Sequence, residues 1–481
     1  MDCFFPVTIC FSLTSDSLPQ SKVEEDVSLP AFDGEKRSCY IFAHAFLPGA
    51  FPLGIGRRIA ANSLVILLAR LIVAGLNLVF VWLISHYLGK KAFGQYAVIS
   101  SAFNLATDIP AAGMNLILIR QIAAQEQLAP QYLGAAMFLR LIFGGLLGLI
   151  ATVVVTFLPL AAPVRAAAYV GIVWMFSLLS IYIYVAVLFG FERFYLQAVL
   201  NVANMLLTIV FAFLILQLNF RWRLAGVIAA SALANVIIAR LGFTLAFKKM
   251  MAPQKPQSRD VYVNLLRQSL PVGVATILLN LYERIDIFLL GHLRGSDEVA
   301  IFYAPYRIVQ QLIVLPNMIV RPAYPILSRF AREDRTRFRR LLLKLSIAFV
   351  LIATIVSSVL YLLSGAIIVR IFGTGFHASI PVLQYLSFLL FVMFPNSLLW
   401  FSLLSLGRQV GLTYALACTV VTNFLLDYLL IPSLGAIGAC IGTIAGQLAF
   451  LLFCCASILF QRKAQPAEES EQLEAPRFPD T

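Results

Sequence analysis

Long apolar stretches recur along the chain from residue 59 to residue 461, and short polar segments separate them. Each stretch holds about 20 residues or more, which is enough for a helix to cross roughly 30 Å of hydrocarbon. The apolar side chains occur all round these helices rather than along one stripe, and this excludes ordinary surface helices. The pattern predicts about twelve membrane spans, at residues 59–88, 93–119, 132–158, 164–190, 195–217, 224–247, 266–290, 298–327, 341–363, 378–405, 410–431 and 434–461.

The longest polar connection within the apolar part of the chain, residues 250–267, divides the predicted spans into two sets of six. Because six is even, both halves enter the membrane from the same side, as in a parallel repeat about an axis along the membrane normal. A polar elbow at Gly89 also has a counterpart at Gly295, with His86 and His292 in matching places. We therefore predict an all-α, polytopic membrane protein with two parallel-repeat six-helix lobes around a central cavity.

Composition agrees with this organisation, because 60% of the residues are hydrophobic and only 12% are charged, whereas soluble domains have about 25% charged residues. The two ends of the chain differ from the rest, and the tail is acidic and contains proline, as disordered segments are. The predicted segments are a poorly ordered leader at 1–55, an N-terminal six-helix lobe at 56–250, a cytoplasmic linker at 251–265, a C-terminal six-helix lobe at 266–463 and a disordered tail at 464–481.

The formal net charge of +13 follows from topology rather than from binding to nucleic acid. If the first span starts inside, basic residues gather in the inner connections, most densely in residues 329–344, and few lie on the opposite side. This is the positive-inside pattern, so we expect a multi-pass protein of the cell (inner) membrane with both termini in the cytoplasm. The seven cysteines show no metal-ligand spacing, and no disulfide, metal or cofactor is expected.

Ionisable residues within the predicted spans are the candidate site, because a charge at membrane depth costs at least about 2.5–3.5 kcal/mol unless it faces a partner or a watery cavity. Arg70 in the first span and Asp108 in the second lie at similar depths, and we expect them to pair in the cavity. Asn77 lies on the same helical face as Arg70. The alternative is a salt bridge that only locks two helices together.

The seventh and eighth spans carry the other half of the candidate site. Asn280, Glu283 and Arg284 share one helical face, and Asp286 follows them. Arg307, in the next antiparallel span, is expected at the level of Glu283 or Asp286. This stripe predicts a lining of the cavity in which Arg284 or Arg307 meets an anionic group. The alternative is a salt-bridge network in the outer leaflet.

Four further charges lie within the spans, and the three arginines among them have two interpretations each. Arg140, Arg240 and Arg321 are expected to extend towards the membrane interface. If these arginines face the cavity instead, they form a basic vestibule suited to pyrophosphate. Asp427, near the outer end of the eleventh span, is a candidate ligand of a coupling cation.

Short motifs at the span boundaries carry a resemblance to a known family. These motifs are residues 87–97 (YLGKKAFGQYA), 112–116 with 120–123, 284–286 with 299–303, 372–376 and 430–439. Over about residues 57–461 the chain resembles the polysaccharide-transporter (oligosaccharide flippase) branch of the multidrug/oligosaccharidyl-lipid/polysaccharide exporter superfamily. It departs from the family at Ala300, where glycine is usual, and in its atypical leader.

The resemblance implies a flippase or exporter that moves a lipid-linked oligosaccharide or polysaccharide precursor across the cytoplasmic membrane by alternating access. Its partners would be a polyprenyl-pyrophosphate-linked glycan and membrane lipids, and a monomer is expected. A cation-coupled multidrug or metabolite antiporter of the same superfamily is the alternative, but it favours an acidic pocket, whereas most charges within these spans are basic. A membrane glycan polymerase or ligase is disfavoured because the outer loops are short and no catalytic motif occurs.

Overall fold

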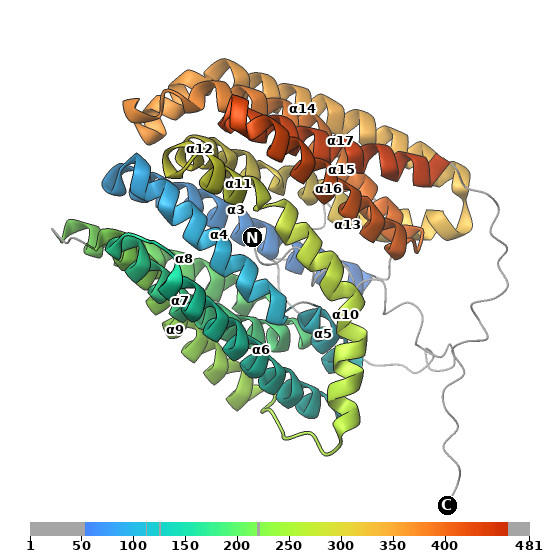
Figure 1. Ribbon diagram of the computed structural model, residues 1–481. Helices are drawn as coiled ribbons and strands as arrows, with labels where there is room; N and C mark the ends of the chain where they lie inside the picture. The colour runs from blue at the N-terminus through green and yellow to red at the C-terminus, as the bar shows by residue number, and fades with distance from the viewer. Residues whose placement is uncertain (1–52, 112, 125–126, 219–221, 460–481) are drawn as a thin grey trace, which may run out of the picture.

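The computed structural model describes residues 53–111, 113–124, 127–218 and 222–459 (Figure 1). These residues form helices joined by short turns, and no strand occurs among them. The predicted tail and nearly all of the predicted leader lie outside the described residues. For the part of the chain that the structure describes, the all-α fold class is confirmed.

Helices follow one another closely along the described chain, and their order matches the predicted spans. Before the linker the helices are α3 (Leu53–Leu88), α4 (Lys90–Ala111), α5 (Met114–Ala124), α6 (Ala129–Phe157), α7 (Ala162–Gly190), α8 (Phe194–Gln217) and α9 (Arg223–Lys249). After it they are α10 (Arg259–Tyr282), α11 (Ile285–Leu293), α12 (Ser296–Leu312), α13 (Val314–Glu333), α14 (Arg335–Phe372), the short 3-10 helix η2 (Thr374–Phe376), α15 (Ser379–Ser405), α16 (Gln409–Leu434) and α17 (Ala436–Leu459).

The helices have the length and the surface of membrane spans. Within the described residues, eleven candidate spans are long and apolar enough to cross a membrane, and the bent pair α4–α5 brings the number to twelve. Helices α6 and α14 expose large apolar side chains, including Leu141 (68% exposed) and Leu362 (78% exposed). Such surfaces are unfavourable in water and favourable against lipid. The protein is a multi-pass membrane protein.

Three of the predicted spans are each divided into two helices. Gly113 separates α4 from α5 with a φ of +70°, and the span bends there by 42°. A β-carbon at Gly113 would also overlap the carbonyl oxygen of Ser269 in α10, so glycine suits both the turn and the contact. The break between α12 and α13 follows from Pro316, because proline has no N–H to donate to the carbonyl of Leu312. The third break, between α10 and α11, forms part of the candidate site.

The helices form two groups (Figure 1). In the first helix group, α3–α9, α7 packs against α4, α6 and α9, and α8 packs against α3 and α9. In the second helix group, α11–α17, α15 packs against α14 and α17, and α16 packs against α17. Helix α10 contacts both groups, through α4, α5 and α6 on one side and α16 on the other. The exact predicted lobe boundaries remain a prediction.

Helices α4 and α12 join the two groups near the turns at Gly89 and Gly295, and we call this the elbow end. A β-carbon at Gly94 of α4 would overlap the carbonyl oxygen of Ser296 and lie 3.2 Å from the backbone nitrogen of Ala300, both in α12. Phe93 contributes to the same contact, since its ring centroid lies 5.6 Å from that of Tyr303. The two backbones therefore touch at the elbow end. The opposite end, where the α9–α10 connection lies, is the linker end.

Asp334 begins α14 at the linker end, outside the membrane spans. Its carboxylate accepts hydrogen bonds from the backbone N–H groups of Arg337 (3.0 Å) and Thr336 (2.9 Å). The bond from the N–H of Arg337, followed by that from Thr336, lowers the pKa of Asp334 from its ordinary value. A carboxyl group with a lowered folded-state pKa stabilises the helix end above its unfolded-state pKa, and this stabilisation is lost as the pH falls through the folded-state pKa.

We therefore expect acidification to reduce amide-exchange protection in the first turn of α14 in the wild type. Asp334→Ala should lack this protection already at neutral pH, because alanine cannot cap a helix. Asp334→Asn is the matched control, since asparagine caps a helix but does not titrate, and its protection should persist in acid. Hydrogen exchange followed by mass spectrometry measures the effect. Equal protection in wild type and Asp334→Ala at neutral pH would contradict it.

Candidate functional site

The break between α10 and α11 places Arg284 between the two helix groups. The amide of Arg284 bonds to the carbonyl of Leu281 at 3.0 Å, one residue nearer than in an α-helix. Its guanidinium reaches back through Nη1 to the carbonyl oxygen and Oδ1 of Asn280, at 3.1 Å each. The side chain thus satisfies a carbonyl at the helix end. Nη2 of the same guanidinium lies 3.7 Å from Oδ2 of Asp108 in α4.

Asp108 is the residue of the first helix group that meets this arginine. Its side chain is buried, and its Oδ1 accepts a hydrogen bond of 2.9 Å from the hydroxyl of Tyr182 in α7. The Asp108 carboxylate therefore accepts a hydrogen bond from a neutral hydroxyl of the first helix group and lies beside the guanidinium of the seventh span. The sequence gives no distinct signal for Tyr182, because it is one tyrosine in an aromatic-rich apolar span. The predicted pairing of Asp108 with Arg70 remains a prediction.

Apart from Asp286, the remaining predicted cavity residues are half-buried. Asn77 donates to the carbonyl of Val73 in its own helix at 3.0 Å. Glu283 lies 4.0 Å from Arg284 through Oε2 and Nη1. The guanidinium of Arg307 lies 5.5 Å from the centroid of the Tyr303 ring. A role of these residues in binding substrate stays a prediction, as it does for Arg70.

Asp286 contacts the interior of the second helix group and is fully buried. Its Oδ1 accepts a hydrogen bond of 2.9 Å from Nδ2 of Asn423 in α16, and its Oδ2 accepts one of 3.0 Å from the hydroxyl of Thr443 in α17. Asn423 Nδ2 also lies 3.5 Å from Oδ2 of Asp427, one turn further along α16. These four residues, all 0% exposed, form what we call the aspartate cluster.

The aspartate cluster brings two carboxyl groups together without a basic side chain in ion-pair contact among the described residues. Oδ1 of Asp427 is enclosed and meets no hydrogen-bond donor in that part of the chain. A β-carbon at Gly442 would overlap this oxygen, so glycine lets α17 approach it closely. Two enclosed carboxylates cannot both keep their charge without a counter-ion or a proton. In the sequence, the signal for this cluster is the i, i+4 spacing of Asn423 and Asp427 within one apolar span. The sequence analysis predicts a role for Asp427 but not for Asn423.

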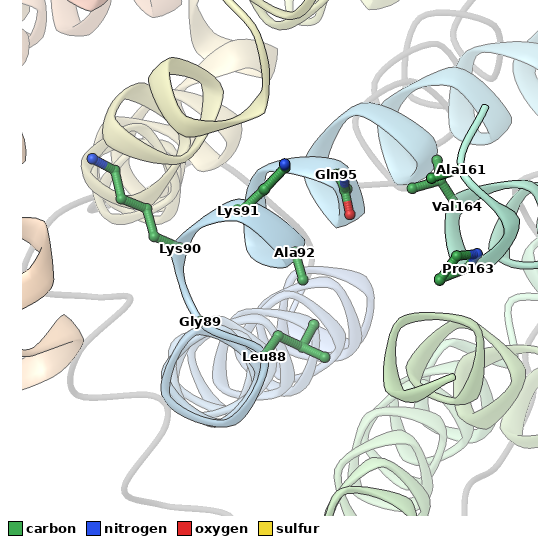
Figure 2. A pocket seen from close by; sticks show the side chains of 9 residues that line it. All are labelled: Leu88, Gly89, Lys90, Lys91, Ala92, Gln95, Ala161, Pro163 and Val164. Carbon is green, nitrogen blue, oxygen red and sulfur yellow. The ribbon is translucent and has the colours of Figure 1, made fainter. Parts of the chain in front are cut away.

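A surface hollow at the elbow end is a weaker candidate (Figure 2). It lies between the α3–α4 elbow and the α6–α7 connection, and Lys90, Lys91, Gln95 and Pro163 are among the residues that line it. Figure 2 shows the Lys90 side chain extending away from the hollow. The lining brings no carboxylate or histidine together with the two lysines. We therefore place the candidate site at the break of the seventh span.

Comparison with known families assigns the chain to one of them. The model of the family described as polysaccharide biosynthesis protein matches residues 59–331, which is more than half of the chain. The chain belongs to this family. The MatE family model also matches, over residues 271–429. The polysaccharide biosynthesis match includes the break of the seventh span and all eight predicted cavity residues.

Two curated proteins similar to this chain are named as a flippase and a transporter. A probable flippase, AglR, from Haloferax volcanii is 29% identical over 174 residues, which cover 34% of this chain and 35% of the relative. A putative O-antigen transporter from Shigella flexneri is 28% identical over 171 residues, which cover 35% of this chain and 40% of the relative. The matched part thus spans little more than a third of the curated relatives' length.

Solved structures share the fold over most of the chain. The lipid II flippase MurJ in an inward closed conformation superposes with a TM-score of 0.69 at 12% identity, over 82% of this chain and 87% of that chain. An inward-facing multidrug resistance MATE transporter of the MOP superfamily superposes with a TM-score of 0.63 at 17% identity, over 82% and 96%. At these identities the likeness concerns the fold, and it confirms the predicted class of a polytopic helical transporter fold.

Proposed function

We propose that this protein moves a lipid-linked oligosaccharide or polysaccharide precursor across the cytoplasmic membrane by alternating access. In this proposal it transports and does not catalyse, acts as a monomer, and has both termini in the cytoplasm. The names of the curated relatives, a flippase and an O-antigen transporter, support the substrate class. The observation that carries the proposal is the contact of Arg284, at the break of the seventh span, with Asp108 of the first helix group.

A diphosphate group would compete with Asp108 for the guanidinium of Arg284. A guanidinium binds phosphate oxygens through two parallel N–H bonds, and this geometry is at least as favourable as its 3.7 Å contact with one carboxylate oxygen. Binding of substrate would therefore separate a contact between α4 and the seventh span. A ligand shifts a conformational equilibrium only by binding the two states with different affinity, and this exchange supplies such a difference. The polyprenyl chain would stay in the lipid.

The aspartate cluster is our proposed site for the driving ion. A monovalent cation or a proton would neutralise one of the two enclosed carboxylates, which otherwise repel each other. Asp286 lies two residues after Arg284, so the same break positions both the candidate substrate contact and the candidate ion contact. Occupation of the cluster would then bias the orientation of α11 relative to α10. The antiporter alternative uses the same cluster but requires a cationic drug or metabolite as cargo.

Transfer by purified protein in vesicles tests the substrate class. Wild type is expected to move a polyprenyl-diphosphate oligosaccharide across the vesicle membrane, and Arg284→Gln is expected to slow the initial rate about tenfold or more, because a charge-assisted bond to phosphate is lost. Arg329→Gln is the matched control, since Arg329 is exposed and forms a surface ion pair with the neighbouring Glu333. Equal rates in wild type and Arg284→Gln would remove Arg284 from the proposal.

Three further measurements separate the alternatives. Asp108→Asn removes the carboxylate but keeps Arg284, so binding of the diphosphate should survive in this variant and fall in Arg284→Gln. Transport of a cationic drug in place of the glycan would favour the antiporter. A change in the mass of the transferred glycan would indicate a polymerase or ligase.

A further inference from the structure

We infer that Arg140 and the first turn of α5 form an oxyanion site for a phosphate group. In this structure α10 covers the site. The inference rests on the proposed function for the natural ligand, which would be the diphosphate of a lipid carrier. The oxyanion chemistry itself follows from the residues of α5 and α6. This site is separate from the contact between Arg284 and Asp108.

Arg140 lies in the first half of α6 and is only 2% exposed. By volume it is the largest fully buried side chain among the described residues. Its Nη2 donates to Oδ1 of Asn115 in α5. Neither Nε nor Nη1 meets an acceptor in the described part of the chain. Asp108, the carboxylate of the neighbouring α4, contacts Arg284 instead. The partner seen for Arg140 is therefore a neutral amide.

A guanidinium keeps its charge in proteins, so Arg140 cannot become neutral to reduce the cost of burial. Charges enclosed within membrane proteins normally have a counter-ion or line a watery path. The planar fork of N–H groups on arginine matches the oxygens of a phosphate group and binds two of them at once. Nε and Nη1, on different edges of the Arg140 guanidinium, meet no acceptor among the described residues, so a phosphate oxygen could bind either one beside the Nη2 that contacts Asn115.

The first turn of α5 adds a second positive element at the same place. Gly113 ends the break before α5, and its carbonyl accepts the N–H groups of Leu116 and Ile117 at 3.2 Å each. Asn115, which Arg140 contacts, is the second residue of this helix. The N-terminus of a helix carries a partial positive charge and N–H groups suited to anions. Asn115 is only half-buried, so this place borders accessible space.

Helix α10 lies over this place from the other side. A β-carbon at Gly113 would overlap the carbonyl oxygen of Ser269, so α10 touches the break directly. The hydroxyl of Ser269 is itself enclosed and without a partner among the described residues. Helix α10 also contacts α5 and α6. Separation of α10 from α5 would expose Arg140 to a ligand, and this is a movement that alternating access between the two groups requires.

Asn115→Asp provides a test that does not depend on removing the arginine. The new carboxylate would stand where the amide oxygen now accepts from Arg140, and it would neutralise the guanidinium from within the protein. We expect this variant to bind diphosphate at least about tenfold more weakly than wild type, with an unchanged or higher melting temperature. Arg140→Gln should show the same loss of affinity. Arg240→Gln, which replaces an exposed arginine of α9, should bind as wild type does.

Native mass spectrometry or calorimetry of the full chain in nanodiscs measures binding with three probes: inorganic pyrophosphate, a short-chain prenyl diphosphate and the matching prenyl alcohol. A loss of affinity for prenyl diphosphate alone identifies the lipid carrier as the source of the oxyanion, and a loss for pyrophosphate as well identifies phosphate in general. Equal affinities of wild type and Asn115→Asp for both diphosphates would overturn the inference. Transfer in vesicles is measured separately, so a failure of the proposed function remains distinguishable from a failure of this site.

Discussion

Replacing Gly94 with valine is expected to stop transport, because the elbow end of the two helix groups can then no longer close. In the closed contact a β-carbon at this position would overlap the carbonyl oxygen of Ser296 and lie 2.8 Å from its carbonyl carbon. Backbone atoms cannot rotate away as a flexible side chain can, so α12 must move back from α4. Protein interiors are densely packed, and a contact of this kind is either made or broken rather than stretched.

Cross-linking measures the position of the elbow end directly. A β-carbon at Gly291 would lie 3.2 Å from a side-chain methyl of Val98, so Val98→Cys with Gly291→Cys should form a disulfide when α4 and α11 are in contact. In a background without the native cysteines, we expect Gly94→Val to reduce this cross-link strongly and to abolish glycan transfer in vesicles.

Gly75→Val is the matched control, because a β-carbon there meets nothing within 4 Å and Gly75 also lies inside a helix. Both substitutions carry the same change in helix propensity, so a difference between them reports the contact with Ser296. A normal cross-link and normal transfer in Gly94→Val would show that the elbow end does not need this close approach. Gly94→Ala should lie between wild type and Gly94→Val in both measurements.

Asp427→Asn is expected to uncouple transport from its driving ion. The substitution keeps the size of the side chain but removes one of the two enclosed carboxyl groups, so the aspartate cluster no longer needs a counter-ion or a shared proton. We expect the initial transfer rate of the wild type to depend on a sodium or pH gradient across the vesicle membrane. In Asp427→Asn the rate should fall about tenfold or more and lose this dependence.

The same change should make the protein more resistant to heat, since a buried carboxylate without a basic partner opposes folding. Loss of transport together with a raised melting temperature would separate a functional effect from misfolding. Asp297→Asn is the control, because Asp297 is exposed in the first turn of α12. An unchanged response to both gradients in Asp427→Asn would exclude the cluster as the coupling site.

The span pattern could be predicted because hydropathy reports directly on burial in lipid. The helices end where the apolar runs end at the elbow, with α3 ending at Leu88 as predicted. Helix α14 differs, since it begins at Arg335 and ends at Phe372 rather than running from 341 to 363. Arginine and leucine both favour helices, so the helix continues beyond the apolar core that hydropathy detects.

The break between α10 and α11 was not located by the sequence, and the candidate site lies at this break. Asp286 and Arg284 are two residues apart and were predicted to line one cavity, yet Arg284 contacts Asp108 of α4 and Asp286 contacts α16 and α17. A continuous helix would orient residues at this spacing about 200° apart. Which neighbour each of them meets depends on how the helices pack around the break at Glu283 and Arg284.

The sequence by itself determined that the chain crosses the membrane about twelve times in helices and that charged residues at depth mark its functional interior, because both properties depend on the free energy of each segment in lipid. Tertiary structure alone decided which charges meet: Asp108 with Arg284, Asp286 with Asn423 and Thr443, and Arg140 with a neutral Asn115. These partners come from distant parts of the chain, and their contacts result from how the helices pack and where they break.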